Sequence, residues 1–539
     1  MEFDYVVIGA GSAGCAVAAR LSEAGDATVG LLEAGGRDSN PWIHIPVGYF
    51  KTMNSSLDWK YMTEPDPGLN GRRLPWPRGK VLGGSSSLNG LLYVRGQAQD
   101  YDGWRQSGNT GWGWDDVLPY FRRSEKQERG EDAYHGADGP LSVSNMRLKR
   151  RICDEWVEAA QKAGYAYNDD YNGATQEGVG YFQLTAANGV RCSSATAYLK
   201  PARNRKNLDV ITRAHVKRIV FDADKRATGV EILRGGKTEI IRARSEIILC
   251  AGALGSPQIL MLSGIGPGDH LSEMNIDTVH EAAAVGTNLQ DHLQARLIYK
   301  CTRPTMNNEV RSLFGKMKIA AEYALKRSGP MTMAASLAVG FMKTRPELAT
   351  PDIQFHIQPW SADSTSEGVH PFSAFTASVC QLRPESAGHL LLDPENPLGA
   401  PKIHPNYLAT PLDCATAVAG VKVAQKIAGF EPLKAAITEE LRPGPDRTTD
   451  DDLLQWVRDT ASSIYHPTGT CRMGQDDGAV VDERLRVRGV TGLRVADCSI
   501  MPKIVSGNTN APAIMIGEKL SDMVREDARQ NKNRLAGAA

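Results

Sequence analysis

The sequence predicts an α/β protein of two domains: a doubly wound domain with a parallel sheet, and an α+β domain with a largely antiparallel sheet. Three observations predict this. A glycine-rich turn between a buried strand and a helix opens the chain, a second strand–glycine–helix unit lies around residues 246–266, and strand candidates with alternating polarity gather after residue 350. At 539 residues the chain is also too long for a single core.

The opening unit predicts a dinucleotide site. It consists of a strand, three glycines in G-x-G-x-x-G spacing, a helix and a second strand: Tyr5–Ile8, Gly9, Gly11, Gly14, Cys15–Leu21 and Val29–Leu32. The first glycine permits a tight turn, the second lets a pyrophosphate approach the backbone, and the third lets the helix pack closely on the strand. Glu33 ends the second strand, where a carboxylate accepts both ribose hydroxyls and repels a 2′-phosphate. A glycine-rich turn in an unrelated α/β protein is the alternative, but every part of the unit agrees with a nucleotide site.

Composition excludes several classes of function. Lys plus Arg and Asp plus Glu both number 62, which argues against a nucleic-acid or polyanion partner. The sequence shows neither a secretory signal nor an apolar run of about 18 residues, so we expect no membrane-spanning helix. Nine scattered cysteines without a C-x-x-C pair predict a reduced, cytoplasmic protein with no structural metal.

Loops and helices alternate between the two glycine-rich units. Arg37–Asp66 predicts a long irregular excursion, because it is rich in proline, asparagine and aromatic residues. Gly79–Gly96 contains two glycines followed by three serines, which suits a backbone lying against a ligand but also a flexible loop. Helical periodicity marks Trp104–Glu125 and Lys149–Ala163, and the polar stretch Asn168–Leu199 predicts loops that cover a ligand.

The second glycine-rich unit, Gly252–Gly266, follows a buried strand at Glu246–Ala251. If the two units share one sheet, two halves of a domain can hold one dinucleotide. A further strand and a small antiparallel meander are predicted before it, at Leu208–Thr212, Val216–Phe221, Gly229–Leu233 and Thr238–Ile241.

The second domain begins near residue 296. Its predicted strands and helices are Ile353–Gln358, Ala374–Leu382, His389–Leu392, Lys402–His404, Ala415–Ala428 and Asp450–Ala461. Arg311–Arg327 predicts an amphipathic helix with a basic face, which we expect to pack on a core with its lysines in solvent. Contact with anionic lipid or with a partner is the alternative.

The C-terminal stretch returns to the first domain. Leu493–Ala496 predicts a strand that ends at Asp497, Pro512–Val524 predicts a closing helix, and the residues after Asp527 are predicted to be disordered. His466 precedes a proline on an extended loop. The other histidines are expected to be structural, with His292 and His356 as mild exceptions.

Together these motifs resemble the glucose–methanol–choline (GMC) flavoprotein oxidoreductases over nearly the whole chain, in particular the bacterial alcohol, sorbose and choline dehydrogenases. Gly79–Gly96 and Gly252–Gly266 are similar to the two family signatures. His466 followed by Asn508 resembles the catalytic pair, which in other members is His–His. The resemblance implies an FAD-dependent alcohol dehydrogenase with a Rossmann-like FAD-binding domain and a largely antiparallel substrate-binding domain.

The resemblance also implies a place for each part of FAD. The pyrophosphate would lie on Gly11, Ser12 and Ala13, the ribose on Glu33, and the adenine on the backbone of Val216. The implied cofactor-binding set is Gly9, Gly11, Ser12, Ala13, Gly14, Glu33, Ala34, Gly79, Val81, Gly84, Asn89, Gly90, Leu91, Val216, Gly252, Ser256, Asp497, Cys498, Asn508 and Thr509. The implied divisions are residues 1–155, 201–295 and 461–530 for the FAD-binding domain, 156–200 for a substrate-side segment, 296–460 for the substrate-binding domain and 531–539 for a tail.

Leu88 bears on how the flavin is held. Some members of the family bind FAD covalently through a histidine in the first signature. Leu88 occupies that position here and cannot form the bond, so we expect non-covalent FAD.

The chemistry follows from the residue types. Alcohol oxidation removes a proton from oxygen and a hydride from carbon, and the flavin takes the hydride. A neutral imidazole suits the proton, which makes His466 the expected general base. Asn508 can donate to the developing alkoxide, and the helix near Pro512 directs its positive end toward the flavin.

The expected substrate is a neutral primary alcohol. Choline-oxidising relatives place a glutamate in a stretch that matches Ser336–Phe341, and Leu337 falls on that position. The trimethylammonium group of choline, facing leucine in place of glutamate, would lack the carboxylate that compensates its desolvation. Leu337 and three further residues form the expected substrate site: Phe341, Trp360 and Tyr465.

Several alternatives stay open. They are a polyol such as sorbose, choline, an oxygen-using oxidase in place of a quinone-like acceptor, and a non-redox flavoprotein or lyase. The oligomeric state is open too, as is peripheral contact with the inner membrane.

Overall fold

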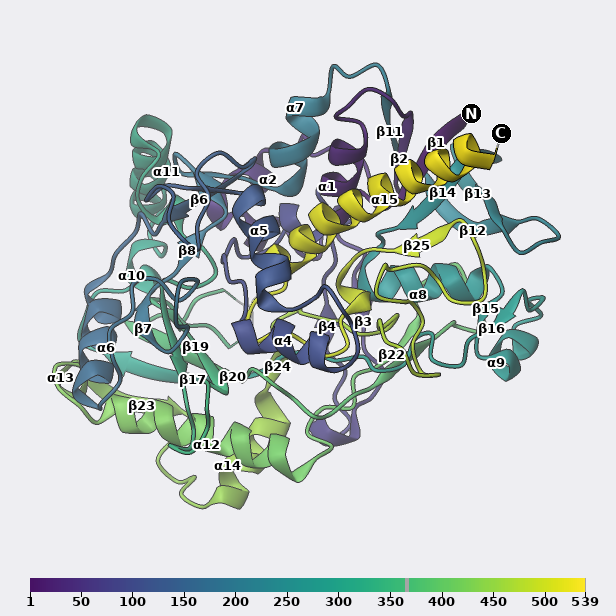
Figure 1. Ribbon diagram of the computed structural model, residues 1–539. Coiled ribbons are helices and arrows are strands. Elements are labelled where there is room, and N and C mark those ends of the chain that lie inside the picture. The colour runs from purple at the N-terminus through teal and green to yellow at the C-terminus, as the bar shows by residue number, and fades with distance from the viewer. Residues whose placement is uncertain (364–367, 539) are drawn as a thin grey trace.

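The computed structural model describes residues 1–363 and 368–538, and two large sheets organise them. In Figure 1 the first sheet lies on the right, near both termini, and the second lies on the left. The α/β fold class expected from the sequence is confirmed, with one largely parallel and one antiparallel sheet.

The first sheet combines the two glycine-rich units. Its strands, in spatial order, are β11 (Leu208–Thr212), β2 (Val29–Glu33), β1 (Glu2–Ile8), β14 (Lys237–Leu249), β13 (Ala227–Arg234) and β12 (His215–Phe221), with β25 (Leu493–Val495) paired to β14. Strands β11, β2, β1, β14 and β25 run parallel to their neighbours, whereas β12, β13 and the first half of β14 form an antiparallel meander. The carboxyl ends of β1, β14 and β25 therefore meet at one edge.

The two strands expected at Thr238–Ile241 and Glu246–Ala251 are one strand, β14. Its first half pairs with β13 and its second half with β1. The polar residues between the two expected strands do not break it, because Arg242 and Ala243 pair with Glu2 and Phe3 at the start of β1.

The second sheet is antiparallel throughout its described pairings. Its strands, in order, are β23 (Ile437–Arg442), β17 (Leu293–Cys301), β20 (Ala374–Gln381), β19 (Ile353–Gln358), β18 (Ala338–Met342) and β7 (Gly178–Tyr181), with β24 (Ser462–Ser463) paired to β17. The strands expected at His389–Leu392 and Lys402–His404 do not join it. They pair with each other as a separate ribbon, β21 (His389–Leu391) and β22 (Lys402–His404).

Helices cover both sheets. On the first sheet α1 (Ser12–Leu21) packs against α15 (Asn510–Ala538), which also contacts α5 (Trp114–Ser124). On the second, α12 (Pro411–Ala428) packs against β20 and β17. The other described α-helices are α2 (Pro41–His44), α3 (Tyr49–Thr52), α4 (Ala98–Gln106), α6 (Arg151–Lys162), α7 (Lys200–Ala202), α8 (Gly252–Leu262), α9 (Gly268–Glu273), α10 (Met306–Glu309), α11 (Leu313–Lys326), α13 (Leu433–Ala436) and α14 (Asp450–Thr460). Within the described residues, no helix has both the length and the apolar character needed to cross a bilayer.

The helix expected at Trp104–Glu125 is two helices, α4 and α5. Gly108 and Gly111 between them have φ angles of 95° and 84°, values that interrupt a right-handed helix. The second helix then begins with Asp115 and Asp116 in its first turn, where carboxylates favour a helix N-terminus.

The prediction of a disordered tail after Asp527 was wrong, because α15 continues to Ala538. Asp527 itself explains part of this. Its carboxylate pairs with Arg494 at 2.7 Å and with Arg484 at 2.8 Å, and Arg494 is buried between it and Glu246. These ion pairs hold the helix against the loop that leads to β25.

The expectation that Arg311–Arg327 packs on a core was also wrong. The segment forms α11, but Tyr323 is its one buried residue. Tyr323 donates a hydrogen bond from its hydroxyl to the carbonyl of Gly189. The helix is therefore held along one narrow side and exposed elsewhere.

Candidate active site

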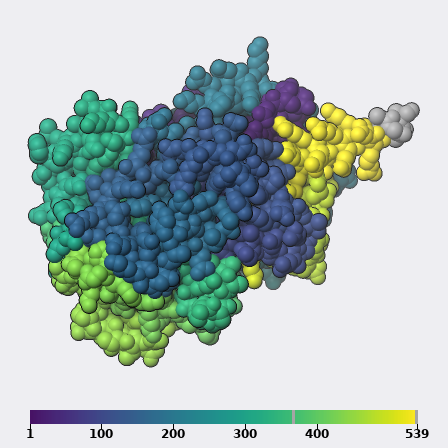
Figure 2. Space-filling view, turned by 60° about the vertical axis from the view of Figure 1, so that its left-hand side comes forward, coloured from purple at the N-terminus to yellow at the C-terminus, as the bar shows by residue number. Residues whose placement is uncertain are grey.

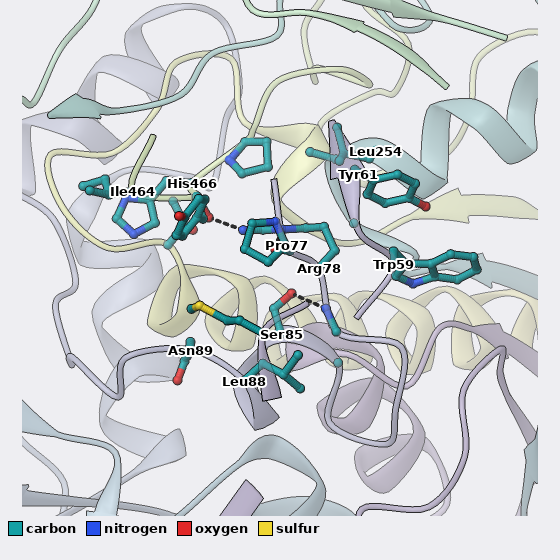
Figure 3. A pocket seen from close by; sticks show the side chains of 18 of the residues that line it. Trp59, Tyr61, Pro77, Arg78, Ser85, Leu88, Asn89, Leu254, Ile464 and His466 are labelled. Atoms are coloured by element: carbon teal, nitrogen blue, oxygen red, sulfur yellow. Dashed lines mark hydrogen bonds between the residues drawn. The ribbon is translucent and has the colours of Figure 1, made fainter. Parts of the chain in front are cut away.

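A cavity of about 580 Å³ runs between the glycine-rich units and the second sheet. In Figure 3 His466 and Ile464 lie at one end and Trp59 and Tyr61 at the other, with Arg78 and Leu88 between them. Residues of both sheets line the cavity, so the side chains at its two ends differ in chemical character.

The glycine turn after β1 has the geometry expected of a dinucleotide cradle. Gly9 has a φ of 95°, and a Cβ there would lie 2.5 Å from the carbonyl oxygen of Cys250. At Gly14 a Cβ would lie 1.9 Å from the carbonyl oxygen of Gly9, so helix α1 approaches the strand only because no side chain intervenes. Gly84 packs on Gly11 so closely that a Cβ on it would lie 2.7 Å from the Cα of Gly11. This bare backbone fits a pyrophosphate.

Glu33 is buried at the edge of this cradle. Its two carboxylate oxygens accept backbone N–H groups of Ala10 at 3.0 Å and of Gly35 at 2.8 Å. Burial raises the pKa of Glu33 to about 7, although these two hydrogen bonds act in the opposite direction. The residue lines the cavity with acceptor capacity left for ribose hydroxyls.

Asp497 links the turns that follow strands β14 and β25. Its carboxylate accepts hydrogen bonds from the Gly252 N–H at 2.8 Å, the Ser256 hydroxyl at 2.6 Å and the Ser499 N–H at 2.8 Å. Ser256 does not line the cavity and acts here through Asp497. The arrangement fixes the turn after β14 against the turn after β25.

Most of the expected cofactor residues reach one cavity. The residues that line it are Gly9, Gly11, Ser12, Ala13, Glu33, Ala34, Gly79, Gly84, Asn89, Gly90, Leu91, Val216, Gly252, Asp497, Cys498, Asn508 and Thr509. Gly14, Val81 and Ser256 are not among the lining residues. Trp59, Tyr61 and His215 lie beside Val216 at the adenine end; Trp59 stacks on Tyr61 and meets the edge of His215.

The expected catalytic pair is assembled at the other end. Asn508 Nδ2 lies 3.1 Å from His466 Nε2, and Nδ1 of the same imidazole lies 3.0 Å from Nδ1 of His292. The second ring nitrogen of His292 contacts the carbonyl oxygen of Leu382 at 2.9 Å. A carbonyl only accepts, so His292 Nε2 carries the proton there.

Asp291 fixes the loop that carries His466. Its carboxylate accepts the His466 N–H at 2.6 Å and the hydroxyls of Tyr407 and Ser463, each at 2.5 Å. Tyr465, which precedes the histidine, has a φ of 68°, an uncommon conformation that this network holds. The imidazole is thereby aimed into the cavity.

Burial keeps the imidazoles of this end neutral. It lowers the pKa of His466 well below its usual value of 6.5, and His292, His356 and Arg78 lower it further. Burial also lowers the pKa of His292 to about 4 and that of His356 to about 3. At neutral pH His466 is therefore a free base.

The substrate side of the cavity differs from the expectation. Trp360 and Tyr465 line it, but Leu337 and Phe341 are fully buried elsewhere in the second sheet. Ala335 and Ser336, which precede β18, line the cavity instead of Leu337.

Arg296 is a charged group of this side that the sequence did not reveal; Asp363 and Arg442, which pair with each other, also line the cavity. Arg296 comes from β17, lies over the ring of Trp360 at 5.7 Å, and forms neither a hydrogen bond nor an ion pair with any described residue. The Tyr49 hydroxyl, Gln358 Oε1 and Trp360 Nε1 are likewise buried without a partner in the described chain. Polar atoms in this state point to a ligand that carries hydrogen-bonding groups.

Sequence reasoning missed the roles of Arg296, Arg78 and Asp291. Asp291 and His292 follow each other in the sequence, and a polar pair before a strand was the available signal. Arg78 contacts the Tyr465 carbonyl at 2.5 Å, a contact between residues far apart in the chain that no local pattern shows.

A dinucleotide cradle that faces a neutral histidine–asparagine pair across one cavity is the arrangement of an oxidoreductase with a dinucleotide cofactor. The GMC oxidoreductase family models match residues 3–294 and 384–517. The chain belongs to the GMC oxidoreductase family, and FAD is its cofactor, in agreement with the bare backbone at Gly11 and with Glu33.

Curated relatives cover nearly the whole chain. The chain is 41% identical to an alcohol dehydrogenase [acceptor] of Pseudomonas putida, over 97% of this chain and 95% of that one. It is 43% identical to an oxygen-dependent choline dehydrogenase of Brucella ovis, over 97% and 96%.

Solved structures share the fold. Pyridoxine 4-oxidase from Mesorbium loti superposes with a TM-score of 0.88 at 30% identity, covering 97% of this chain and 99% of that one. An arginine-to-alanine variant of the formate oxidase of Aspergillus oryzae RIB40 superposes with a TM-score of 0.90 at 28% identity, covering 98% of this chain and 99% of that one.

Proposed function

We propose that the chain oxidises an uncharged primary alcohol to the aldehyde and passes the electrons to a quinone-like acceptor. The contact between His466 Nε2 and Asn508 Nδ2 carries this proposal, because it places a neutral base and a hydrogen-bond donor at one point of the cavity wall. The relatives named for alcohol and choline support an alcohol as the substrate class.

FAD, when bound, supplies the hydride acceptor. His466 Nε2 takes the proton of the substrate hydroxyl, and its lowered pKa keeps it ready to do so at neutral pH. Asn508 Nδ2 donates to the same oxygen as negative charge develops. Gln354 Nε2, 3.3 Å from Asn508 Oδ1, holds that amide with its donor toward the histidine.

Arg296 argues against choline. A trimethylammonium group beside Arg296 would meet a second, desolvated cation, because Asp363, which also lines the cavity, already pairs with Arg442. Leu337 does not line the cavity and so does not select against a cationic substrate. An uncharged alcohol meets no such repulsion and can pack on Trp360.

A polyol is the second candidate, and a specific observation favours it. The Tyr49 hydroxyl and Gln358 Oε1 are unbonded in the described chain, and both residues line the cavity. Additional hydroxyls of a sugar alcohol would give these atoms partners.

The test is anaerobic reduction of the FAD-loaded protein by four substrates: a medium-chain alkanol, a benzylic alcohol, a sugar alcohol and choline. Flavin bleaching with the highest kcat/KM for the alkanol or the benzylic alcohol is the expected result. Choline in first place contradicts the proposal, and bleaching by none of the four favours a non-redox flavoprotein. Dye reduction measured against peroxide formation then separates a dehydrogenase from an oxidase.

A further inference from the structure

Helix α11 presents a continuous apolar surface to solvent. The exposed fractions of Leu313, Phe314, Met317 and Leu325 are 75%, 78%, 61% and 83%. On a helix with 3.6 residues per turn, Leu313, Met317 and the three exposed alanines of α11 fall in one row beside Phe314 and Leu325. A stripe of this kind on a monomeric surface marks an interaction site.

Lysines border this stripe on both sides. Lys316 lies next to Leu313 on one side, at a spacing of three, and Lys318 lies next to Phe314 on the other, at a spacing of four. Glu322 is the one acid in the sequence of the helix, and it accepts a hydrogen bond from Ser328 near the narrow attached side. In the described part of the chain, neither lysine pairs with a carboxylate.

The surface stands out from the molecule. Figure 1 shows α11 at the upper left edge, at the opposite end from the termini, and in Figure 2 the teal-green part of the chain that includes α11 forms the upper left margin. A second exposed aromatic residue, Trp42 of α2, lies on a neighbouring element. Both α2 and α11 hold the hairpin β9 (Ala186–Ala187) and β10 (Val190–Arg191), through the Arg191 side chain on the Ile43 carbonyl and the Tyr323 hydroxyl on Gly189.

We propose that α11 docks on an anionic lipid surface. Its apolar stripe would lie at the level of the acyl-chain boundary, with Lys316 and Lys318 on the phosphates at either side. Lysine is depleted from the cores of protein–protein interfaces, whereas amphipathic helices at a lipid surface carry lysines along the border of their apolar face. The convex, protruding shape also suits a planar surface. The proposal does not depend on the proposed function.

Helix α11 lies a few residues before part of the cavity lining in the sequence. The chain runs from α11 through the 3₁₀ turn Pro330–Thr332 to Ala335 and Ser336, which line the cavity. The same turn contacts the turn Pro46–Gly48 that leads into α3, where Tyr49 also lines it. Docking through α11 would therefore hold the substrate side of the enzyme at the lipid surface.

Co-sedimentation of the FAD-loaded full chain tests this, with vesicles of phosphatidylcholine alone and of equal parts phosphatidylcholine and phosphatidylglycerol. The protein is expected to pellet with the anionic vesicles and to be released by high salt. Phe314→Ser is expected to weaken binding about tenfold or more, from the lost apolar burial. The double variant Lys316→Glu, Lys318→Glu is expected to weaken binding to the anionic vesicles by at least about fivefold for each lysine replaced.

Matched controls lie in the first sheet. Leu233→Ser and Lys237→Glu alter an apolar residue that is 40% exposed and an exposed lysine, both near the turn between β13 and β14, and should leave vesicle binding unchanged. Wild-type protein that stays in the supernatant with both vesicles, or Phe314→Ser that binds as well as Leu233→Ser, overturns the proposal. So does a wild-type dimer that Phe314→Ser converts to a monomer in light scattering, because α11 is then an interface between copies.

Hydrogen exchange of the wild type provides a readout that needs no variant. Amides of residues 313–326 should be protected by anionic vesicles, while those of β13 should not change. Equal exchange with and without vesicles contradicts the proposal even if a variant fails to retain FAD.

Discussion

The Nδ1 atoms of His292 and His466 lie 3.0 Å apart, and this contact assigns the protons of both rings. His292 donates from Nε2 to the Leu382 carbonyl, so its Nδ1 in the neutral ring is an acceptor. His466 must then donate from Nδ1, which leaves the lone pair of its Nε2 facing Asn508 and the cavity. His292 is therefore a positioning residue that selects the tautomer of His466.

Replacing His292 should show this role in the pH profile. His292→Leu is expected to lower kcat/KM on the order of 10²-fold, because His466 loses the partner that fixes its tautomer. The acid limb of the profile should also move to higher pH, since His292 lowers the pKa of His466. His292→Asn, which keeps an acceptor near the position of Nδ1, should recover part of the rate. If the acid limb stays at its wild-type pH and the two variants have equal kcat/KM, the role of His292 is purely structural.

Removing the base should separate chemistry from cofactor binding. His466→Ala is expected to retain FAD and to lose turnover by about 10²–10⁴-fold. Asn508→Ala should lose less, because water can partly replace a donor. Rapid-scanning absorbance under anaerobic conditions measures the reductive step directly. A His466 variant that is reduced at the wild-type rate would remove this residue from the mechanism.

The charge of Arg296 should decide between uncharged and cationic substrates. Arg296→Glu is expected to raise kcat/KM for choline relative to an alkanol on the order of 10²-fold, as repulsion becomes attraction. Arg242→Glu, an exposed reversal in β14, is the matched control. The ratio of the two kcat/KM values measures the effect, and a ratio that is the same in both variants would show that substrate does not reach Arg296.

Leu88 predicts the fate of the flavin on denaturation. The residue lines the cavity and has no nucleophile, so acid precipitation should release all FAD into the supernatant. Absorbance of supernatant and pellet at the flavin maximum checks this. Yellow colour that stays with the protein would mean a covalent link elsewhere in the chain.

His135 predicts a loss of stability in mild base. It lies 3.0 Å from Glu125 and 3.1 Å from Asp170, and these hydrogen bonds outweigh burial and raise its pKa to about 9. A pKa raised above the unfolded value of 6.5 contributes stability that is complete below pH 6.5 and is lost as pH rises through about 9. The unfolding free energy should fall by on the order of 2–3 kcal/mol over this range, measured by denaturant titration at fixed pH. His135→Gln should flatten that slope; an equal slope in both proteins would contradict the assignment.

Local patterns predicted the elements that carry local signals. The turn from Gly9 to Gly14 and the acid at Glu33 were readable because a strand, a turn and a helix follow one another within one unit. The same local signals misplaced boundaries where tertiary contacts decide. Glu2 and Phe3 pair with Arg242 and Ala243, so β14 continues through these residues, and Arg494 anchors α15 at Asp527.

The substrate side could not be read in the same way. Leu337 was placed by register along an extended chain, where a shift of one residue exchanges the face that meets the ligand for the face that meets the core. His292 and His466 are separated by 174 positions, and Arg296 is charged but sits among apolar strand residues. Only the folded arrangement of β17 and the loop after β24 brings these groups together.

The two members of the catalytic pair come from opposite sheets. His466 follows β24, an edge strand of the second sheet, whereas Asn508 precedes α15, which packs against α1 of the first domain. In chain order, every strand of the second sheet and all but β25 of the first come before His466. A growing polypeptide therefore contains every strand of both sheets before it contains the complete pair, and a chain that ends before residue 508 lacks the donor.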